Sequence, residues 1–515
     1  MVRSFVERGF VVIDGVSSEF PLSFHENLGA KLESAMNSNS SSEMRVATSN
    51  NVGAVFPEAA RAVRQAAGHF LRKILGPSFV LHAHRHVHWS AAGRDQLWHK
   101  DAYWTRARLR SHRSRWAIAM YYPRGATEAM GPTYVMPGSQ YHTIDKRWPT
   151  LVDRLGVGNC RADRYCDEAA ERQRRLDEDT RLLYPELVDR RGVPIVVEPG
   201  AIVVLHFDLL HRGSSAEPGA RPRPLVKFIF GRTREPERFS GADNMAVGDA
   251  YAYLAGEKLA VADAPPVADA AAILRARNAS EVRRLEAAFS LAAARGHAIK
   301  TLLDGVLRPG LPEAARRAAS SGLAAVGGAA AEALASAETP KDPVSRWYAT
   351  RTLGEIATTK TGFEALVRAL ESRDDDVLRS TAAEALGVAL QRECFGVYVD
   401  KLVRAIPDHP VESDGAAASG KRDQVGQAAA FALLGLLENP RTRRCVRPRA
   451  IGTKCRGIVA RADVNDRYVV ATCFDILASL ARDDPALEKD LFTALLDSRW
   501  CERTNFGAKQ LRHFL

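Results

Sequence analysis

A histidine and an aspartate two residues apart, His99 and Asp101, form the most suggestive metal-binding spacing in the chain, in the segment Trp-His-Lys-Asp at 98–101. In a strand, residues i and i+2 point to the same side. His99 and Asp101 would then offer an imidazole nitrogen and a carboxylate oxygen to one ion, while Lys100 faces away. This tripeptide is common by chance and needs a third ligand, for which His211 is the candidate, after a Pro-Gly turn and an apolar run.

Two histidines and one carboxylate on one face of an octahedron are the ligand set of non-haem Fe(II) oxygenases, and they leave three positions open. Two of these can accept a bidentate 2-oxo acid and the third can accept dioxygen. The distal carboxylate of such an acid needs a fixed cation, and the planar fork of arginine suits it. Arg223, on the predicted strand after His211, is placed for this role.

The elements that must position these residues change character near residue 265. Before it, short β-type runs alternate with turn residues and predict an all-β core with inserted helices. The predicted strand runs are 79–89, 115–123, 132–139, 194–207 and 224–232. A charged segment at 163–191 predicts a helical surface excursion or lid with i,i+4 ion pairs. The glycines Gly131, Gly138 and Gly200 are typical of turns.

After residue 265 the chain is rich in Ala, Leu and Arg with helical spacing, and the text repeats. Arg346 and Arg379 lie 33 residues apart, as do the Leu-Gly pairs that begin at Leu353 and Leu386. Weaker copies occupy 281–294, 312–326, 424–437 and 466–480. Such a period predicts stacked helix pairs, with an Asp capping helix starts and small residues allowing close approach. The pattern, clearest over 374–387, resembles HEAT repeats; an irregular helical domain is the alternative.

Further motifs join the His and Asp residues in one order along the chain. Residues 5–16 read Phe-Val-Glu-Arg-Gly-Phe-Val-Val-Ile-Asp-Gly-Val, 98–104 contain Trp-His-Lys-Asp, and 120–142 contain Gly-Pro followed by Pro-Gly-Ser-Gln. The last block runs from Pro199 through His211 to the strand that begins near Arg223. Over roughly residues 1–235 this combination resembles the phytanoyl-CoA dioxygenase family of Fe(II)/2-oxoglutarate oxygenases, with Gln140 where the family commonly has His.

The resemblance implies a double-stranded β-helix, a cupin-like jelly roll with helical insertions over 1–265 whose mouth holds the metal. It implies His99, Asp101 and His211 as iron ligands, and therefore as the catalytic centre, with 2-oxoglutarate and O2 as cosubstrates. For the 2-oxoglutarate anchor it leaves two arginines open. Arg223 is preferred because Pro-Leu-Val follows it as in the family pattern, and Arg221 is the alternative.

Asp101 also bears on the reaction type that the resemblance implies. Related halogenases replace this carboxylate with a small residue so that chloride can bind iron. Because Asp101 is present, hydroxylation or another oxidation of an unactivated C–H bond is favoured, with release of succinate and CO2. The substrate itself is not indicated, since one fold and one iron site serve many small molecules.

Four histidines, His82, His84, His86 and His88, alternate along the predicted strand 79–89 and would all point to one side. Adjacent members of such a row are about 7 Å apart, too far for several to meet one ion unaided. We therefore expect His86 and His88 to line the substrate or cosubstrate pocket, with a partly exposed face as the alternative and a second metal site as a lesser one.

Tyr103 and Trp104 follow the metal motif closely, and we expect them to line the substrate pocket or to pack beneath it. The arginine-rich stretch 105–115 comes next. It is either a rim that recognises an anionic substrate group or a solvated basic loop, the latter being favoured. His142 and His206 are predicted to be structural.

Composition excludes several classes. The 515 residues carry a net charge of +11, and the 72 Lys and Arg divide 36 and 36 at residue 265, which argues against a concentrated nucleic-acid-binding face. No run approaches the roughly 18–20 apolar residues of a spanning helix, and the N-terminus lacks a signal-peptide pattern. The seven scattered cysteines include no Cys-x-x-Cys pair and predict reduced thiols. A cytoplasmic location is expected.

The sequence therefore predicts two domains, an oxygenase jelly roll over 1–265 and an all-α, HEAT-like solenoid over 266–515. The predicted partner of the jelly roll is a small-molecule substrate, with an anionic one left open. The solenoid would recruit a protein partner or cover the active-site mouth, because stacked helices offer extended surfaces. Two alternatives stand beside this: a non-catalytic interaction protein whose solenoid is the functional part, and an oxygenase of a macromolecule that the solenoid recruits.

Overall fold

The computed structural model describes most of both halves. The described residues are 1–36, 52–76, 78–90, 96, 98, 100–101, 111–112, 114–141, 192–235, 266–276, 278–294, 296–337, 340–373, 375–407, 424–461 and 467–482. The predicted domain boundary at 265/266 and the charged segment 163–191 lie outside this part of the chain.

The larger sheet has five antiparallel strands in the order β1-β6-β3-β8-β2. In that order the strands are β1 (Phe10–Ile13), β6 (Ala201–His206), β3 (Trp116–Tyr122), β8 (Pro224–Arg234) and β2 (Ser78–Trp89). Each lies in a predicted strand run or, for β1, in the segment matched to the family's N-terminal lead. Branched and aromatic residues dominate them, as pleated strands with covered faces require.

A smaller sheet, in the order β5-β4-β7, lies opposite the larger one. Its strands are β5 (Val193–Pro194), β4 (Thr133–Val135) and β7 (His211–Gly213), with the short 3-10 turn η1 (Ser139–Tyr141) following β4. Side chains alternate along β3, so that Ile118, Met120 and Tyr122 pack in the core between the sheets. Two antiparallel sheets facing across an apolar core are the layout expected of a jelly roll.

Helices near the N-terminus cover the outer face of the larger sheet. They are α1 (Val2–Arg8), α2 (Leu22–Met36), α4 (Val52–Val55) and α5 (Pro57–Leu75). The longest, α5, begins with proline at its first turn and buries Val63, Phe70 and Leu71 on one face against the strands. The larger sheet is therefore buried on both faces.

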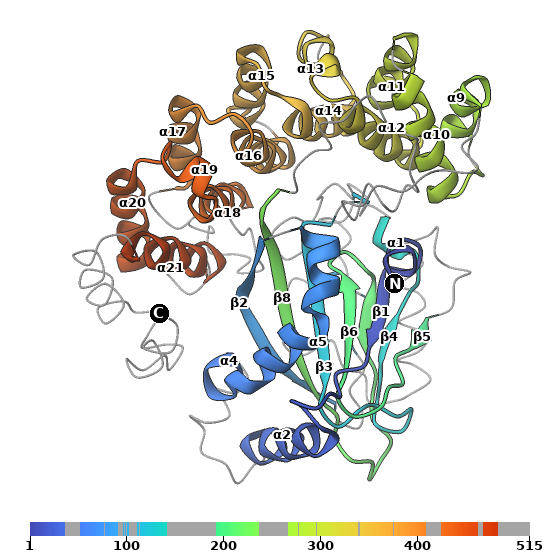
Figure 1. Ribbon diagram of the computed structural model, residues 1–515, viewed down its shortest axis with the longest axis vertical. Helices are drawn as coiled ribbons and strands as arrows, with labels where there is room; N and C mark the ends of the chain where they lie inside the picture. Colours follow the sequence, from blue (N-terminus) through green and yellow to red (C-terminus); the bar gives the residue numbers. More distant parts are fainter. Residues whose placement is uncertain are drawn as a thin grey trace, which may run out of the picture.

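The C-terminal part consists of helices that stack into a curved array over one end of the jelly roll (Figure 1). The inner row, nearer the sheets, is α10 (Glu281–Ala294), α12 (Glu313–Val326), α14 (Pro343–Ile356), α16 (Asp376–Leu390), α18 (Gln424–Glu438) and α21 (Arg467–Ala481). The remaining helices are α9 (Val267–Arg275), α11 (His297–Leu307), α13 (Gly328–Ala335), α15 (Lys360–Leu370), α17 (Gly396–Ala405), α19 (Pro440–Arg443) and α20 (Pro448–Arg461).

Each predicted repeat copy forms one helix of the inner row, and neighbouring members pack against each other. The caps recur as well, because Asp342 and Asp375 each accept a hydrogen bond from a backbone N–H in the first turn. Repeat-related glycines bring the helices together. A Cβ on Gly354 would meet Ala385 of α16 at 2.6 Å, and one on Gly387 would meet Ala432 of α18 at 2.4 Å.

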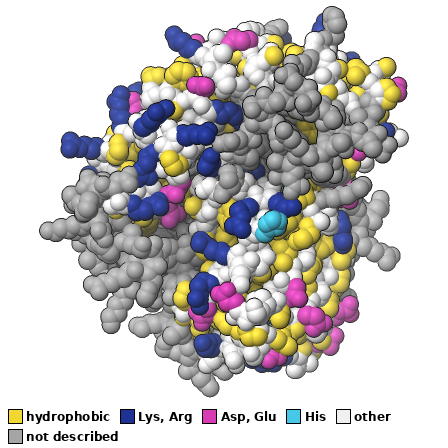
Figure 2. Space-filling model, viewed as in Figure 1, with side chains coloured by type: hydrophobic (Ala, Val, Ile, Leu, Met, Phe, Trp, Pro, Cys, Tyr) yellow, Lys and Arg dark blue, Asp and Glu magenta, His cyan; other side chains and the backbone are white. Residues whose placement is uncertain are grey.

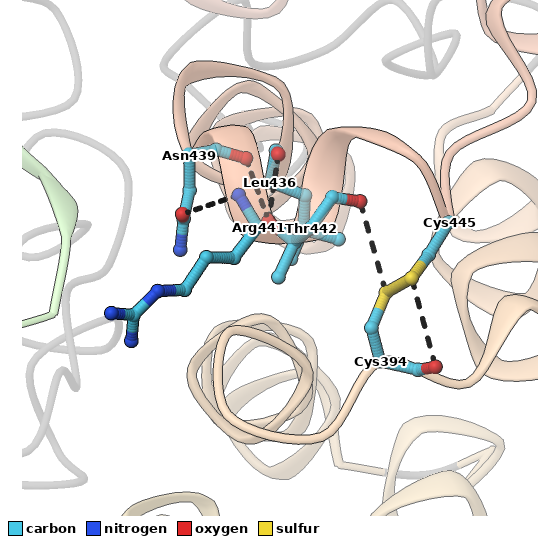
Figure 3. Close-up of a disulfide and its surroundings, with 6 residues drawn as sticks. All are labelled: Cys394, Leu436, Asn439, Arg441, Thr442 and Cys445. Carbon is cyan, nitrogen blue, oxygen red and sulfur yellow. Dashed lines mark hydrogen bonds between the residues drawn. A yellow bond between two sulfur atoms is a disulfide. The ribbon is translucent and has the colours of Figure 1, made fainter.

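One prediction about the cysteines is wrong. Cys394 and Cys445 form a disulfide that links the segment before α17 to the one after α19 (Figure 3). They lie 51 residues apart in sequence, and helix stacking brings their Cα atoms to 6.1 Å. Spacing in the sequence carries no trace of this approach. Cys455 and Cys473 are buried free thiols, as predicted.

The surface charge is unevenly distributed in space. In the view of Figure 2, Lys and Arg side chains gather over the helical array, whereas acidic side chains gather at the opposite end of the molecule. None of the described helices is both long enough and apolar enough to span a bilayer.

Candidate functional site

Two predicted ligands, Asp101 and His211, meet inside the jelly roll. His211 Nε2 lies 3.3 Å from Asp101 Oδ2, and both side chains are buried. His211 opens β7 in the smaller sheet. The segment that carries Asp101 approaches β7, since the backbone N–H of Gln96 donates to Gly213 O at 2.9 Å.

The local geometry of the Trp-His-Lys-Asp segment differs in part from the prediction. Its described residues, Trp98, Lys100 and Asp101, are not in a strand. Lys100 nevertheless points away from the buried Asp101, because its Nζ donates to Ser139 O at 2.7 Å. The side chains of Lys100 and Asp101 thus point apart, although neither residue lies in a strand.

The ring of His211 is oriented by a backbone carbonyl. Its Nδ1 lies 2.9 Å from Leu209 O, which can only accept, so Nδ1 carries a proton and Nε2 is the ring nitrogen directed at Asp101. This orientation leaves Nε2 as the ring atom that a metal ion at Asp101 would meet. Ligands at right angles, each about 2.1 Å from an ion, are about 3 Å apart, which fits the observed separation.

Lys227 supplies a cation here in the structure. Its buried ammonium reaches from β8 and donates to Asp101 Oδ2. This residue was not predicted. The available signal was a single charge in the apolar strand Pro-Leu-Val-Lys-Phe-Ile-Phe, four residues after Arg223 and therefore on the same face of β8.

The other predicted pocket and ligand residues are only partly visible. His99, Tyr103 and Trp104 lie outside the described residues, as does the side chain of His86. Within the part of the chain that is described, no three His, Cys, Asp or Glu side chains converge on one point. The assignment of His99 as the third ligand therefore stays a prediction.

The two candidate arginines differ sharply. Arg223 is 3% exposed, its Nε donates to Gly131 O at 2.9 Å, and its backbone N–H donates to Ser90 Oγ. Its Nη1 is buried without a hydrogen-bond partner among the described residues. Burial lowers the pKa of Arg223, because desolvation disfavours the charged form. Arg221 lies at the surface, half-exposed, where it pairs with Glu33 of α2 at 2.8 Å.

One cavity of about 90 Å³ joins these groups. His211, Arg223, Lys227 and His88 all line it. Arg223, with its buried guanidinium, and His211 thus border the same space. A 2-oxo acid bound at the Asp101–His211 pair would meet the guanidinium with its far carboxylate.

Arg115, the last arginine of the stretch 105–115, belongs to neither predicted alternative. It is buried at the junction of the two halves, where it pairs with Glu235, Glu355 and Glu384. The carboxylates come from far along the chain, so sequence proximity to the metal motif was misleading. The other arginines of that stretch lie outside the described residues.

The remaining histidine and glycine predictions can be compared directly with the structure. His206 contacts Ser111 O and the backbone N–H of Asp208, not the Asp101–His211 pair, in keeping with a structural role. His142 lies outside the described residues. The predicted turn glycines all adopt the left-handed conformation, with φ of 70° at Gly131, 81° at Gly138 and 91° at Gly200.

No protein-family profile matches the chain, and a search of curated proteins finds no similar sequence. Among solved structures, similarity is found to a nickel complex of the non-haem monooxygenase ThoJ, at 17% identity over 46% of this chain and 78% of that one, with a TM-score of 0.30. EctD from S. alaskensis with bound Fe matches at 18% identity, with the same coverages and TM-score. The non-haem alpha ketoglutarate dependent carbocyclase SnoK from nogalamycin biosynthesis matches at 13% identity over 45% and 83%, again with a TM-score of 0.30. Scores this low support no conclusion about this chain, whose own residues must indicate its function.

Proposed function

We propose that the chain is an Fe(II)- and 2-oxoglutarate-dependent oxygenase of phytanoyl-CoA dioxygenase type that oxidises a C–H bond of a small molecule. The observation that carries the proposal is the single cavity shared by His211 and Arg223, with Asp101 Oδ2 3.3 Å from His211 Nε2. A metal-ligand pair and a buried guanidinium facing one space are what a chelating 2-oxo acid requires.

In this proposal Asp101 and His211 hold the iron together with His99, and Arg223 orients 2-oxoglutarate by its far carboxylate. When bound, iron and 2-oxoglutarate supply the oxidising power, with O2 consumed and succinate and CO2 released. The Nδ1–H of His211 fixes the ring through Leu209 O. Met120 and Leu225 contribute apolar walls to the same cavity.

Lys227 neutralises the buried carboxylate of Asp101 in the metal-free chain, because its ammonium donates to Asp101 Oδ2. A metal ion at Asp101 would place a second positive charge beside this ammonium, so the two cations would compete for the carboxylate. The same contact favours a second candidate function, a non-catalytic interaction protein in which an ion pair has replaced the metal.

We further propose the division into an oxygenase domain over 1–265 and a HEAT-like solenoid over 266–515. Its support is the recurrence of capping aspartates and close-approach glycines along the inner row. In this proposal the helical array also recruits a protein partner, because stacked helices offer extended surfaces.

An anaerobic titration of the metal-free chain with Fe(II) and then 2-oxoglutarate tests the proposal. The chelate absorbs in the visible through metal-to-ligand charge transfer, and this band should appear for the native chain and be lost in His211→Ala. His206→Ala is the matched control, since it removes a buried histidine of the same half that does not contact Asp101. A folded chain with no band would favour the interaction-protein function.

A further inference from the structure

A second cavity of about 90 Å³ lies between the jelly roll and the helical array. One wall comes from the β half and includes Trp116, Phe207 and His82; the other comes from the inner helices α16 and α18 and includes Glu384, Gln427 and Phe431. A water molecule needs roughly 10–15 Å³ of such space, so the cavity has room for a molecule of several heavy atoms.

The helical array reaches into the jelly roll at this point. The ring of Phe431, on α18, packs against the core between the two sheets, 4.3 Å from the ring of Trp116. Gly231 on β8 makes the approach possible, because a Cβ there would lie 2.6 Å from both rings. Gly435 similarly lets α18 approach Thr233 of β8, since its Cβ would meet Thr233 O at 2.8 Å. The cavity wall is thus built by both halves.

The side chain of Gln427 marks the polar end of the cavity. It is 6% exposed, and both its Nε2 and its Oε1 are buried without a hydrogen-bond partner among the described residues. Buried amides are almost always paired. Gln427 lines the cavity, and a rotation of its side chain would present one donor and one acceptor to a ligand group that offers an acceptor and a donor in the same arrangement.

The charges around the cavity balance. The charged residues of its lining are Arg115, Arg232, Arg351, Asp208, Glu235 and Glu384. Several already pair with one another, as Arg115 does with Glu235 and Glu384. No excess of one sign remains to attract an ion. The flat rings of Trp116, Phe207 and Phe431 instead offer apolar surface to a planar group.

The cavity also continues the inner face that carries the candidate iron site. On β3, Trp116 lines this cavity, Met120 lines the cavity of Arg223, and Ile118 lies on the same face between them. Four residues of strand span about 13 Å. The two cavities are separated by this packed part of the core, in which Ile118 is fully buried.

We infer that this interdomain cavity binds an uncharged, planar molecule bearing a carboxamide or lactam that pairs with Gln427. The cavity shares no lining residue with the cavity of His211, so the inference is independent of the proposed function. It gives the helical half a direct part in ligand recognition, with Gln427 as the residue that sets the choice of polar group.

Benzamide is the simplest probe, since it combines one flat ring with one carboxamide. Calorimetric titration of the full chain should show saturable binding of benzamide, and benzoate should bind at least tenfold more weakly, because its charge would be buried where the arginines of the lining are already balanced by carboxylates. Gln427→Leu keeps the volume and removes both polar atoms, and it should weaken benzamide binding at least tenfold. Gln424→Leu, on the same helix but outside the cavity lining, should leave it unchanged.

Thr381→Phe gives an independent variant, because a ring placed on α16 fills the cavity and should abolish benzamide binding. Failure of benzamide to saturate the native chain, or equal affinity in Gln427→Leu, would overturn the inference. If the charge-transfer band appears and benzamide does not bind, only this inference fails. Benzamide binding through Gln427 in a chain that shows no band would refute the oxygenase and leave this inference standing.

Discussion

The two arginines that the sequence left open for 2-oxoglutarate differ enough in the structure to make opposite predictions. Arg223 is buried, with Nη1 lacking a described partner inside the cavity of His211. Arg221 is half-exposed and pairs with Glu33. Substituting each with alanine should therefore separate a buried anchor from a surface ion pair.

The expected magnitudes follow from burial. Removing one partner of a buried, hydrogen-bonded ion pair costs about 3–5 kcal/mol, which at about 1.4 kcal/mol per tenfold is a loss on the order of 10²–10³ in affinity for 2-oxoglutarate. Arg221 pairs with Glu33 at the surface and does not line the cavity, so Arg221→Ala should leave the affinity for 2-oxoglutarate near that of the native chain and cost about 1 kcal/mol or less of stability. Arg223→Lys should fall between native chain and Arg223→Ala, because the charge remains without the planar fork.

The assay is the anaerobic titration with 2-oxoglutarate at saturating Fe(II), following the charge-transfer band. Circular dichroism before each titration establishes that the variant is folded. Added guanidinium ion should partly restore binding to Arg223→Ala, since it can occupy the space that the side chain leaves, and should not affect Arg221→Ala. A large loss of 2-oxoglutarate affinity in Arg221→Ala, with native affinity in Arg223→Ala, would refute the assignment of Arg223 as the anchor.

Three further predictions concern stability. Lys227→Met leaves the carboxylate of Asp101 buried without its ammonium partner, so the free energy of unfolding should fall by about 3–5 kcal/mol. In urea titrations Mn(II) should restore the lost stability, and no effect of the metal would argue against a metal site at Asp101. Arg115→Ala breaks ion pairs with three glutamates at the junction and should cost a similar amount, whereas Arg346→Ala, whose pair is more exposed, should cost about 1 kcal/mol or less. Burial lowers the pKa of His112 in the folded chain, so the unfolded chain binds a proton at this imidazole more tightly. The contribution of His112 to stability should therefore be full above pH about 6.5 and decline below it. His112→Asn should flatten that decline in denaturation experiments from pH 7 to pH 5.

Much of the fold could be predicted because the spacing of apolar residues differs between strands and helices. One strand formed from each of the runs 115–123 and 224–232, and one helix formed from each repeat copy of the helical half. Asp101 and His211 could be paired because their chemistry restricts which side chains serve together. Local pattern and ligand chemistry are both readable without knowing how the chain folds back on itself.

What escaped prediction depends on contacts between distant segments. Lys227 reaches Asp101 from another strand, Arg115 meets glutamates of the helical half, and Cys394 bonds to Cys445 across helix layers. None of these partners is fixed by spacing, because each follows from tertiary packing. The unpaired amide of Gln427 is hidden for the same reason, since on its helix the residue reads as ordinary.

The junction itself argues that the two halves act as one unit. Phe431 packs into the core between the sheets, Arg115 is neutralised by carboxylates of the array, and Arg317 of α12 donates to Tyr141 O beside η1. A chain cut near residue 265 would expose the ring of Trp116 and leave Arg115 without Glu355 and Glu384, both destabilising. The helical array is therefore part of the environment in which the jelly roll folds, and a role in recognition is open to it without any motion of one half against the other.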